Sequence, residues 1–357
     1  MPATMPGTTI IGSGRHVPGT PVTNDQLSRV MDTSDEWIRP RSGIAQRHYA
    51  GEGEGVSDLA VPAAQKALEA ANVDRAEIDY IIFATMTPEH VFPGSGALFG
   101  AKLGIPGVPA LDIRQQCAAM PYSFQLADGL IASGAARTVM VVGAEAHAGF
   151  MPYAWDVLLG QSDRELTDEE KDFATKHRGT AVLFGDGAGA LVLRKAGTAG
   201  PAGAPRGFLG AANHSDGRAA DQIWVPGGMF TQRHYWNASS DSHVPAMKGK
   251  DLFKSAVTLL PRAVREVCEK TGVTLEQIDW FVAHQANDRI NASVRHSLGV
   301  PVEKVPSNIA NYGNTSAGTI PILVDEMRRD GRLQEGQLVC FLALGAGLNW
   351  GAALMRM

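Results

Sequence analysis

A lone cysteine follows an apolar stretch in the first half of the chain. Cys117 comes after residues 108–113, which have the pattern of a buried strand, and before an alanine- and glycine-rich segment at 118–136, which we expect to be helical. A helix N-terminus carries partial positive charge and free N–H groups, so this position would favour a reactive thiolate. Taken alone, a cysteine is more often a small buried side chain.

A cysteine nucleophile needs polar partners, and the second half of the chain offers two. His284 follows an apolar run, and Asn314 lies in a polar segment that contains glycine. Singly, each is more often a hydrogen-bonded polar residue or a helix cap. Ala346 sits in a Gly-Ala-Gly turn, where a backbone N–H could approach a substrate oxygen, although a simple strand bend would look the same.

The two halves of the chain repeat one another. The sequence AAQKALEAANVDRAEIDY at 63–80 resembles AVREVCEKTGVTLEQIDW at 263–280, and later segments follow in the same order with similar offsets. Conserved order at a nearly constant offset indicates a duplicated unit. An offset of 197 would place Asn314 where Cys117 lies in the first half. We therefore expect Cys117 and Asn314 to face each other across a pseudo-twofold axis, with His284 beside them.

Helical and strand-like segments alternate, which predicts two α/β halves with a site at their junction. We place the first half at 1–196, with an insertion at about 147–178, and the second at 197–357. A second long segment, 197–249, also interrupts the repeat. We expect helices at 24–31, 57–71 and 92–103, strands at 78–84, 139–143 and 181–184, and a solvated helix face for the charged run at 163–172.

Composition excludes several classes of protein. The 357 residues carry a net charge of −5, which gives no support for nucleic-acid binding. Three cysteines do not make a disulfide framework, no apolar run reaches 18 residues, and residues 1–9 do not have the pattern of a signal peptide. No zinc spacing and no complete dinucleotide fingerprint occur, which argues against an oxidoreductase. We expect a cytoplasmic protein without metal, cofactor or membrane contact.

Several phrases together resemble the β-ketoacyl-acyl-carrier-protein synthase III family of thiolase-fold condensing enzymes. They are DTSDEWI at 32–38, RSGI at 41–44, the cysteine turn, FGDGAG at 184–189, HQAN at 284–287, GNTSA at 313–317 and NWG at 349–351. The resemblance covers nearly the whole chain and implies thiolase-like duplicated α/β halves in a layered αβαβα arrangement. It also implies a homodimer.

The resemblance implies a decarboxylating Claisen condensation through an acyl-cysteine. Cys117 would take the acyl group from acyl-CoA, and malonyl-acyl-carrier protein would then supply the enolate. His284 and Asn314 would donate hydrogen bonds to the malonyl thioester oxygen, and the N–H groups of Cys117 and Ala346 would hold the other oxyanion. Further residues match CoA-binding positions (Thr33, Trp37, Arg41, Arg178, Gly249, Asn287), carrier-protein docking positions (Lys254, Arg289) and an acyl-pocket position that reaches the partner subunit (Phe92).

The chain departs from the usual family pattern at several positions. These are Gln115 and Gln116 for small residues, CAAM at 117–120 for Cys-Ala-Gly-Phe, Lys250 for asparagine, Ala346 for glycine, and the long insertion at 147–178. We expect these changes around the acyl pocket and its entrance, and with them a medium-chain or otherwise unusual primer. An acyltransferase or condensing enzyme of secondary metabolism with a different acceptor, and a non-catalytic binding subunit, are the alternatives.

Overall fold

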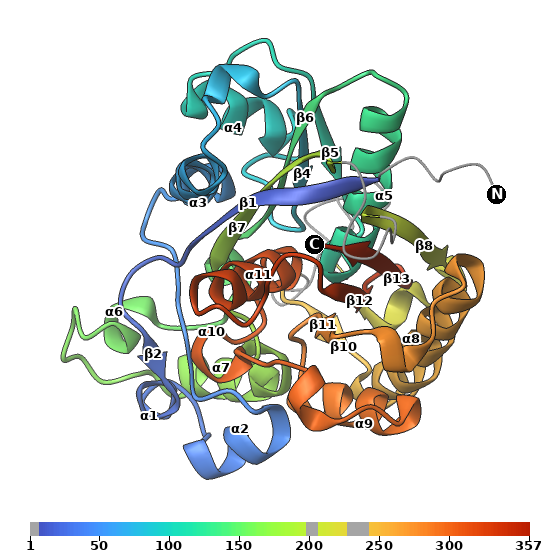
Figure 1. Cartoon of the computed structure of the whole chain (residues 1–357). Helices are drawn as coiled ribbons and strands as arrows, with labels where there is room; N and C mark the ends of the chain where they lie inside the picture. Colours follow the sequence, from blue (N-terminus) through green and yellow to red (C-terminus); the bar gives the residue numbers. More distant parts are fainter. Residues whose placement is uncertain (1–6, 198–205, 227–242) are drawn as a thin grey trace.

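Two β-sheets organise the chain (Figure 1). The computed structural model describes residues 7–197, 206–226 and 243–357. The first sheet has the strand order β1-β7-β6-β4-β5, formed by β1 (Thr8–His16), β7 (Gly187–Lys195), β6 (Thr138–Glu145), β4 (Tyr80–Ala84) and β5 (Ala110–Ile113). The second has the order β11-β12-β13-β8, formed by β11 (Trp280–Ala283), β12 (Leu338–Gly345), β13 (Asn349–Arg356) and β8 (Gly207–Ser215).

The sheets confirm the internal repeat. Read from β8, the second sheet has the same order as the first without β5, and β4 and β6 are matched by β11 and β12 at an offset of 200 residues. Each half pairs two parallel strands (β4 with β6, β11 with β12) and then adds two antiparallel ones. The first half ends with β7 and the second begins with β8, whereas the boundary at 196/197 stays a prediction.

Helices form three layers around the two sheets, which confirms the αβαβα arrangement. Helices α3 (Val56–Ala71) and α4 (Ser95–Leu103) share an apolar core with the outer face of the first sheet, and α8 (Gly249–Thr271) and α9 (Asp288–Leu298) with that of the second. Between the sheets lie α5 (Ala119–Ala132) and α11 (Thr319–Arg329), whose apolar residues pack with strands of both. Helices α5 and α11 are therefore the most deeply enclosed.

Strand β12 illustrates why these segments read as continuous apolar runs. Leu338, Cys340 and Leu342 pack on the outer helices, whereas Val339 and Phe341 pack on the central layer. Both faces of the strand are buried, so alternation with polar residues is lost. The same period of two places consecutive residues of β4 in different cores.

The insertion and the N-terminal helices form a separate layer beside the sheets. Helices α1 (Asn24–Leu27), α2 (Asp35–Ser42), α6 (Trp155–Leu158) and α7 (Asp168–Ala181) share an apolar cluster. The expected strand at 181–184 is wrong, because α7 continues to Ala181 and only Phe184 forms a β-bridge. The expected helices at 24–31 and 92–103 are shorter. The second begins at Ser95, after the Phe92-Pro93 bond.

Two kinds of feature are absent from the described residues. None of their helices is long and apolar enough to cross a membrane. No group of three or more histidine, cysteine or acidic side chains in the same part of the chain could hold a metal ion. Much of the second insertion, at 227–242, lies outside the described residues.

Candidate active site

Matching turns begin the two central helices. Cys117 lies in the 3₁₀ turn η2 (Gln116–Ala118) before α5, and the equivalent turn η9 (Ser316–Gly318) precedes α11. Gln116 and Ser316 both have positive φ, 52° and 46°, in a region that residues other than glycine rarely adopt. The structural offset is thus 200, which pairs Cys117 with Ala317. The expected offset of 197, with Asn314 as the counterpart of Cys117, is wrong.

Asn314 nevertheless lies at the site, because the segment before η9 is tied to the first half. Its backbone N–H donates to the Leu183 carbonyl at 2.8 Å, and the residue forms a parallel bridge with Phe184. The side-chain Oδ1 accepts from the Ser316 N–H at 2.8 Å. Since that hydrogen bond occupies the oxygen, the amide NH₂ is the group left to act as a donor in the site.

The Cys117 side chain is buried at the bottom of the site. Its thiol donates to the Ser316 hydroxyl, with Sγ and Oγ 3.3 Å apart. Burial raises the pKa of Cys117 to about 12; the Glu145 carboxylate adds to this, and the Ser316 hydrogen bond opposes it. The thiolate expected from the helix N-terminus is therefore not the resting form, because desolvation outweighs the local dipole. Attack by Cys117 must be coupled to loss of the thiol proton.

His284 follows the C-terminal end of β11 and is also buried. Its Nδ1 lies 2.7 Å from the Thr319 hydroxyl. Burial lowers the pKa of His284 to about 3, so the imidazole is neutral at physiological pH. A neutral ring has one N–H, and that proton can be on Nδ1 or on Nε2.

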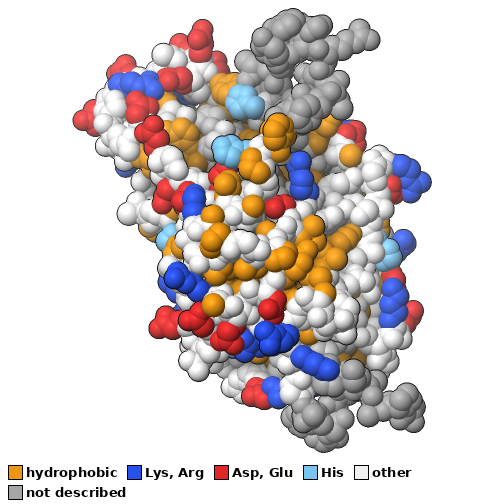
Figure 2. Space-filling model, turned by 90° about the horizontal axis from the view of Figure 1, so that it is seen from above, with side chains coloured by type: hydrophobic (Ala, Val, Ile, Leu, Met, Phe, Trp, Pro, Cys, Tyr) orange, Lys and Arg blue, Asp and Glu red, His pale blue; other side chains and the backbone are white. Residues whose placement is uncertain are grey.

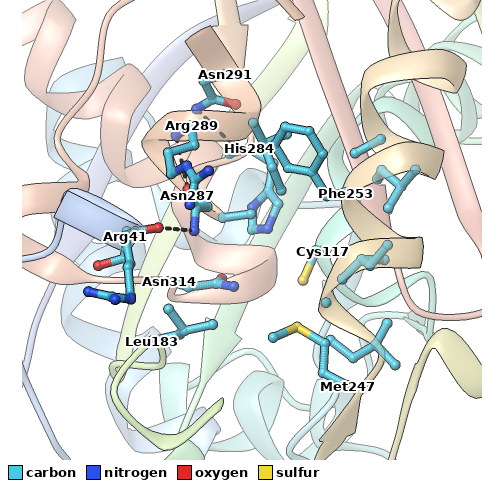
Figure 3. A pocket seen from close by; sticks show the side chains of 18 of the residues that line it. Arg41, Cys117, Leu183, Met247, Phe253, His284, Asn287, Arg289, Asn291 and Asn314 are labelled. Carbon is cyan, nitrogen blue, oxygen red and sulfur yellow. Dashed lines mark hydrogen bonds between the residues drawn. The ribbon is translucent and has the colours of Figure 1, made fainter. Parts of the chain in front are cut away.

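A cavity of about 710 Å³ connects these residues to the surface. Figure 3 shows Cys117, His284 and Asn314 pointing into one space, which Phe253 of α8 and Met247 also border. Ten of the thirteen site residues predicted from the sequence line this cavity: Cys117, His284, Asn314, Ala346, Trp37, Arg41, Gly249, Asn287, Lys254 and Arg289. Apolar residues of α8 at helical spacing, Leu252, Ala256 and Leu260, form much of one wall.

The cavity opening is built on α2. Two guanidinium groups, those of Arg41 and Arg178, lie over the Trp37 ring, each 4.8 Å from the ring centre. Arg178, on α7 of the insertion, also donates to the backbone carbonyl and the carboxylate of Asp32. Asn287 donates to the Arg41 carbonyl at 2.8 Å, which joins α2 to the start of α9. The indole and the guanidinium groups are all planar, and a second flat ring can stack on such groups.

Three predicted site residues do not line the cavity. Arg178 stacks at its opening, Thr33 has a buried hydroxyl without a hydrogen-bond partner among the described residues, and Phe92 is 79% exposed elsewhere on the surface. Of the departures from the family pattern, Lys250 and Ala346 line the cavity, whereas Ala119 and Met120 pack in the central core. The expectation that those two residues shape the acyl site is therefore not met for this cavity.

Sequence reasoning missed two hydroxyl groups. Ser316 contacts the Cys117 sulfur and Thr319 contacts the His284 ring. Both follow Asn314 within five residues, Ser316 as the first residue of η9 and Thr319 as the first residue of α11. The sequence shows a serine and a threonine near a helix start, but hydroxyl side chains at such positions usually cap the helix. Their partners come from distant parts of the chain.

Comparison with known proteins gives a consistent result. A model described as 3-oxoacyl-[acyl-carrier-protein (ACP)] synthase III C terminal matches residues 268–357, and one described as 3-oxoacyl-[acyl-carrier-protein (ACP)] synthase III matches 111–161. The chain is 42% identical over 349 residues to a β-ketoacyl-[acyl-carrier-protein] synthase III of Rhodospirillum rubrum, covering 98% of both chains. A relative of that name from Bordetella petrii is 40% identical, with 98% of this chain and 97% of the relative covered.

Two solved structures have the same fold as this chain. The 3-oxoacyl-[acyl-carrier-protein] synthase III of Aquifex aeolicus superposes with a TM-score of 0.83 at 36% identity, covering 98% of this chain and all of the other. The priming β-ketosynthase of the R1128 polyketide biosynthetic pathway superposes with a TM-score of 0.84 at 28% identity, covering 99% and 97%.

Proposed function

This chain belongs to the 3-oxoacyl-[acyl-carrier-protein] synthase III family, and we propose that it joins an acyl-CoA primer to malonyl-acyl-carrier protein with loss of CO₂. The product is a β-ketoacyl-acyl-carrier protein, and the reaction is the first condensation of fatty acid biosynthesis. The observation that carries the proposal is the meeting of a buried thiol, a neutral imidazole and an amide donor around one cavity that opens at Trp37. The protein is thus an acyltransferase, and the reaction needs no metal or cofactor.

The first step forms an acyl-cysteine. The Cys117 sulfur attacks the thioester carbonyl as its proton leaves, the carbon–sulfur bond to CoA breaks, and CoA departs as the thiol. The N–H groups of Cys117 and Ala346 hold the oxyanion of the tetrahedral intermediate. Close packing supports this pairing, because a Cβ on Gly345 would lie 2.8 Å from the backbone nitrogen of Cys117.

The second step uses the other two side chains. Loss of CO₂ from the malonyl group leaves an enolate, whose carbon attacks the acyl carbonyl and releases the Cys117 sulfur, which regains a proton. His284 and Asn314 donate to the malonyl thioester oxygen as its negative charge develops. A single preorganised donor of this kind typically contributes about 100- to 1000-fold in rate.

CoA enters along the opening of the cavity. Trp37 and Arg178 take the adenine between them, Arg41 lies near the phosphates, and Gly249 and Asn287 line the channel for the pantetheine arm. Thr33 matches a family residue that lines the same channel, although Thr33 does not line the cavity in this structure. The apolar wall of α8 supports use of a medium-chain or otherwise unusual acyl group.

The acidic carrier protein docks beside the same opening. Lys254 and Arg289 are exposed there, on α8 and α9, and Lys250 lies one turn before Lys254. A protein with a net charge of −5 needs such a local basic patch to attract an acidic partner. We also expect the protein to act in the cytoplasm, where carrier-protein substrates are used.

A homodimer completes the acyl site. Strand β5 lies at the edge of the first sheet, Leu111 on it is 38% exposed, and Phe92 is 79% exposed. Figure 2 shows hydrophobic side chains gathered across the middle of one face of the molecule, with charged side chains around them. Such concentrations are typical of subunit interfaces. In the dimer, Phe92 would reach the acyl pocket of the partner subunit.

A second candidate lies within the same chemistry. The likeness to a priming β-ketosynthase of a polyketide pathway favours an acyltransferase or condensing enzyme of secondary metabolism, with a different acceptor. The site would look the same, and only the acceptor would distinguish the two.

Mass spectrometry of the intact protein tests the proposal. The protein is exposed to a series of acyl-CoAs of increasing chain length and then to malonyl-acyl-carrier protein. We expect a Cys117 adduct for the preferred primers and a β-ketoacyl-carrier product after the second addition. A Cys117→Ala variant that still acquires the adduct would exclude this nucleophile. A sharp optimum with acetyl-CoA would exclude the medium-chain primer, and an adduct without condensation would favour the second candidate.

A further inference from the structure

The Thr319 hydroxyl lies between two acceptors. Its Oγ1 is 2.7 Å from Nδ1 of His284 and 3.0 Å from the Ser316 carbonyl oxygen, and all three residues are buried. A hydroxyl has one proton and can donate it fully to one partner at a time. The choice between the two acceptors therefore fixes where the imidazole proton lies.

Each choice gives a different ring. When Thr319 donates to the Ser316 carbonyl, it must accept from Nδ1–H, and Nε2 then faces the cavity as a lone pair. When Thr319 donates to Nδ1, the single proton of the neutral ring lies on Nε2, which becomes a donor. Protonating both nitrogens is disfavoured, because burial lowers the pKa of His284 to about 3.

The Ser316 carbonyl would keep one hydrogen bond if the Thr319 hydroxyl donated elsewhere. It also accepts the backbone N–H of Thr319, at the junction of η9 and α11. Nδ1, by contrast, has the Thr319 hydroxyl as its hydrogen-bond partner in the described part of the chain, and this is the shorter of the two contacts. Donation of the Thr319 hydroxyl to Nδ1 therefore leaves none of these three groups without a hydrogen bond.

We propose that Thr319 is a positioning residue that donates to Nδ1 and so commits the His284 proton to Nε2, the nitrogen that must donate to the malonyl thioester oxygen. This rests on the proposed function. The same segment orients the second donor, because the Ser316 N–H holds the Asn314 Oδ1 and leaves the amide NH₂ for the substrate. Residues 314–319 thus set the polarity of both donors, although Thr319 does not itself line the cavity.

Two measurements test the proposal. Nitrogen-15 NMR of histidine-labelled protein, assigned with a His284→Gln variant, reports which ring nitrogen carries the proton. Kinetics of the two half-reactions, acylation of Cys117 and condensation of the acylated protein, are compared for Thr319→Val and Thr319→Ser. Thr271→Val is the matched control, because the Thr271 hydroxyl donates to a helix carbonyl, that of Val267, far along α8.

We expect the wild-type protein to carry the proton on Nε2. Thr319→Val should slow condensation about 3- to 10-fold, the value of one hydrogen bond, and leave acylation within about 2-fold. Thr319→Ser should restore condensation, and Thr271→Val should change neither step. A proton on Nδ1 in the wild-type protein, or an equal loss of both half-reactions in Thr319→Val, overturns the proposal. Failure of the wild-type protein to condense would instead refute the proposed function, and the NMR result would stand by itself.

Discussion

The thiol of Cys117 donates a hydrogen bond to the hydroxyl of Ser316, 3.3 Å away, across the junction between the two halves of the chain. Ser316 occupies in the second half the position that Gln116 occupies in the first, and both have positive φ. The duplicated turn is thus used twice for different purposes. One copy presents the nucleophile, and the other presents the hydroxyl that contacts it.

This contact leads to a prediction about the reactivity of Cys117. Because burial raises the thiol pKa to about 12, the thiolate is a small fraction at neutral pH and grows with every increase in pH. The rate of alkylation by iodoacetamide should therefore rise about tenfold per pH unit from 7 to 10 without a plateau. Peptide mapping separates Cys117 from Cys268 and Cys340.

Ser316→Ala should lower the alkylation rate at each pH, because the Ser316 hydroxyl can rotate to donate to the thiolate and so lowers the pKa of Cys117. Ser123→Ala serves as the control, because the Ser123 hydroxyl donates to a carbonyl within α5. A plateau near pH 7 to 8 would contradict the high pKa, and an unchanged rate in Ser316→Ala would contradict the role of the hydrogen bond.

His284 should make the protein less stable in acid. Its pKa is about 3 in the folded protein, below its ordinary value of 6.5, so the unfolded chain binds more protons between these values. The contribution of His284 is complete above pH 6.5 and is lost as the pH falls. Between pH 7 and 5 it amounts to about 2 kcal/mol of unfolding free energy.

Urea unfolding of the wild-type protein and a His284→Gln variant at both pH values measures this contribution. Acidic residues elsewhere contribute equally to the two proteins, so their effect cancels in the difference. The variant should lose about 2 kcal/mol less than the wild type between pH 7 and 5. Equal losses would show that the imidazole is not held neutral by burial.

Much of the architecture could be predicted from local pattern and from the repeat. Apolar runs marked β4, β6 and β12 because both faces of these strands are buried, and the offset of 200 between the halves holds for strands and turns alike. Cys117, His284 and Asn314 could be found because their residue types follow strands or precede helices. What joins them in space is the sheet topology, which the repeat also indicated.

Other features depended on contacts that no local pattern reveals. Because Asn314 precedes a helix, the sequence matched it with Cys117. The true counterpart is Ala317, three residues later, and Asn314 instead reaches the site through its β-bridge to Phe184. The helix N-terminus suggested a thiolate, but the sequence does not show how completely the thiol is buried. The segment 181–184 read as a strand because it is apolar, and its apolar residues instead follow α7 into a turn.

The orientation of Asn314 leads to a third prediction. Asn314→Asp keeps the oxygen that accepts the Ser316 N–H and replaces the donor that faces the cavity with a second oxygen. Condensation should fall about 100- to 1000-fold, since a carboxylate oxygen cannot donate to the thioester oxygen. Acylation of Cys117 should continue, as mass spectrometry of the intact protein would show.

Asn311→Asp is the control for this charge change, because Asn311 is exposed in the preceding helix α10 (Ile309–Tyr312). It should condense at the wild-type rate. If Asn314→Asp condenses within a few-fold of the wild type, the amide is not the donor, and the second step must rely on His284 alone.

Arg178 connects the long insertion to substrate binding, which gives the last prediction. Its guanidinium and that of Arg41 each lie 4.8 Å from the centre of the Trp37 ring. In the proposed CoA complex the adenine stacks between Trp37 and Arg178. Arg178→Gln removes the cation but keeps a polar side chain. The KM for acyl-CoA should rise about tenfold, the value of a partly desolvated cation–π contact, with kcat nearly unchanged.

Acyl-pantetheine provides the internal comparison, because it has the thioester and the arm but no adenine. Its use should be unaffected by Arg178→Gln. Arg164→Gln is the matched variant in the same insertion, where Arg164 pairs with Asp156 and Glu170 away from the cavity. Arg164→Gln should leave the KM and kcat for both substrates unchanged. An equal loss with acyl-CoA and acyl-pantetheine in Arg178→Gln would mean that Arg178 supports the fold of α7 against Asp32 and does not bind the nucleotide.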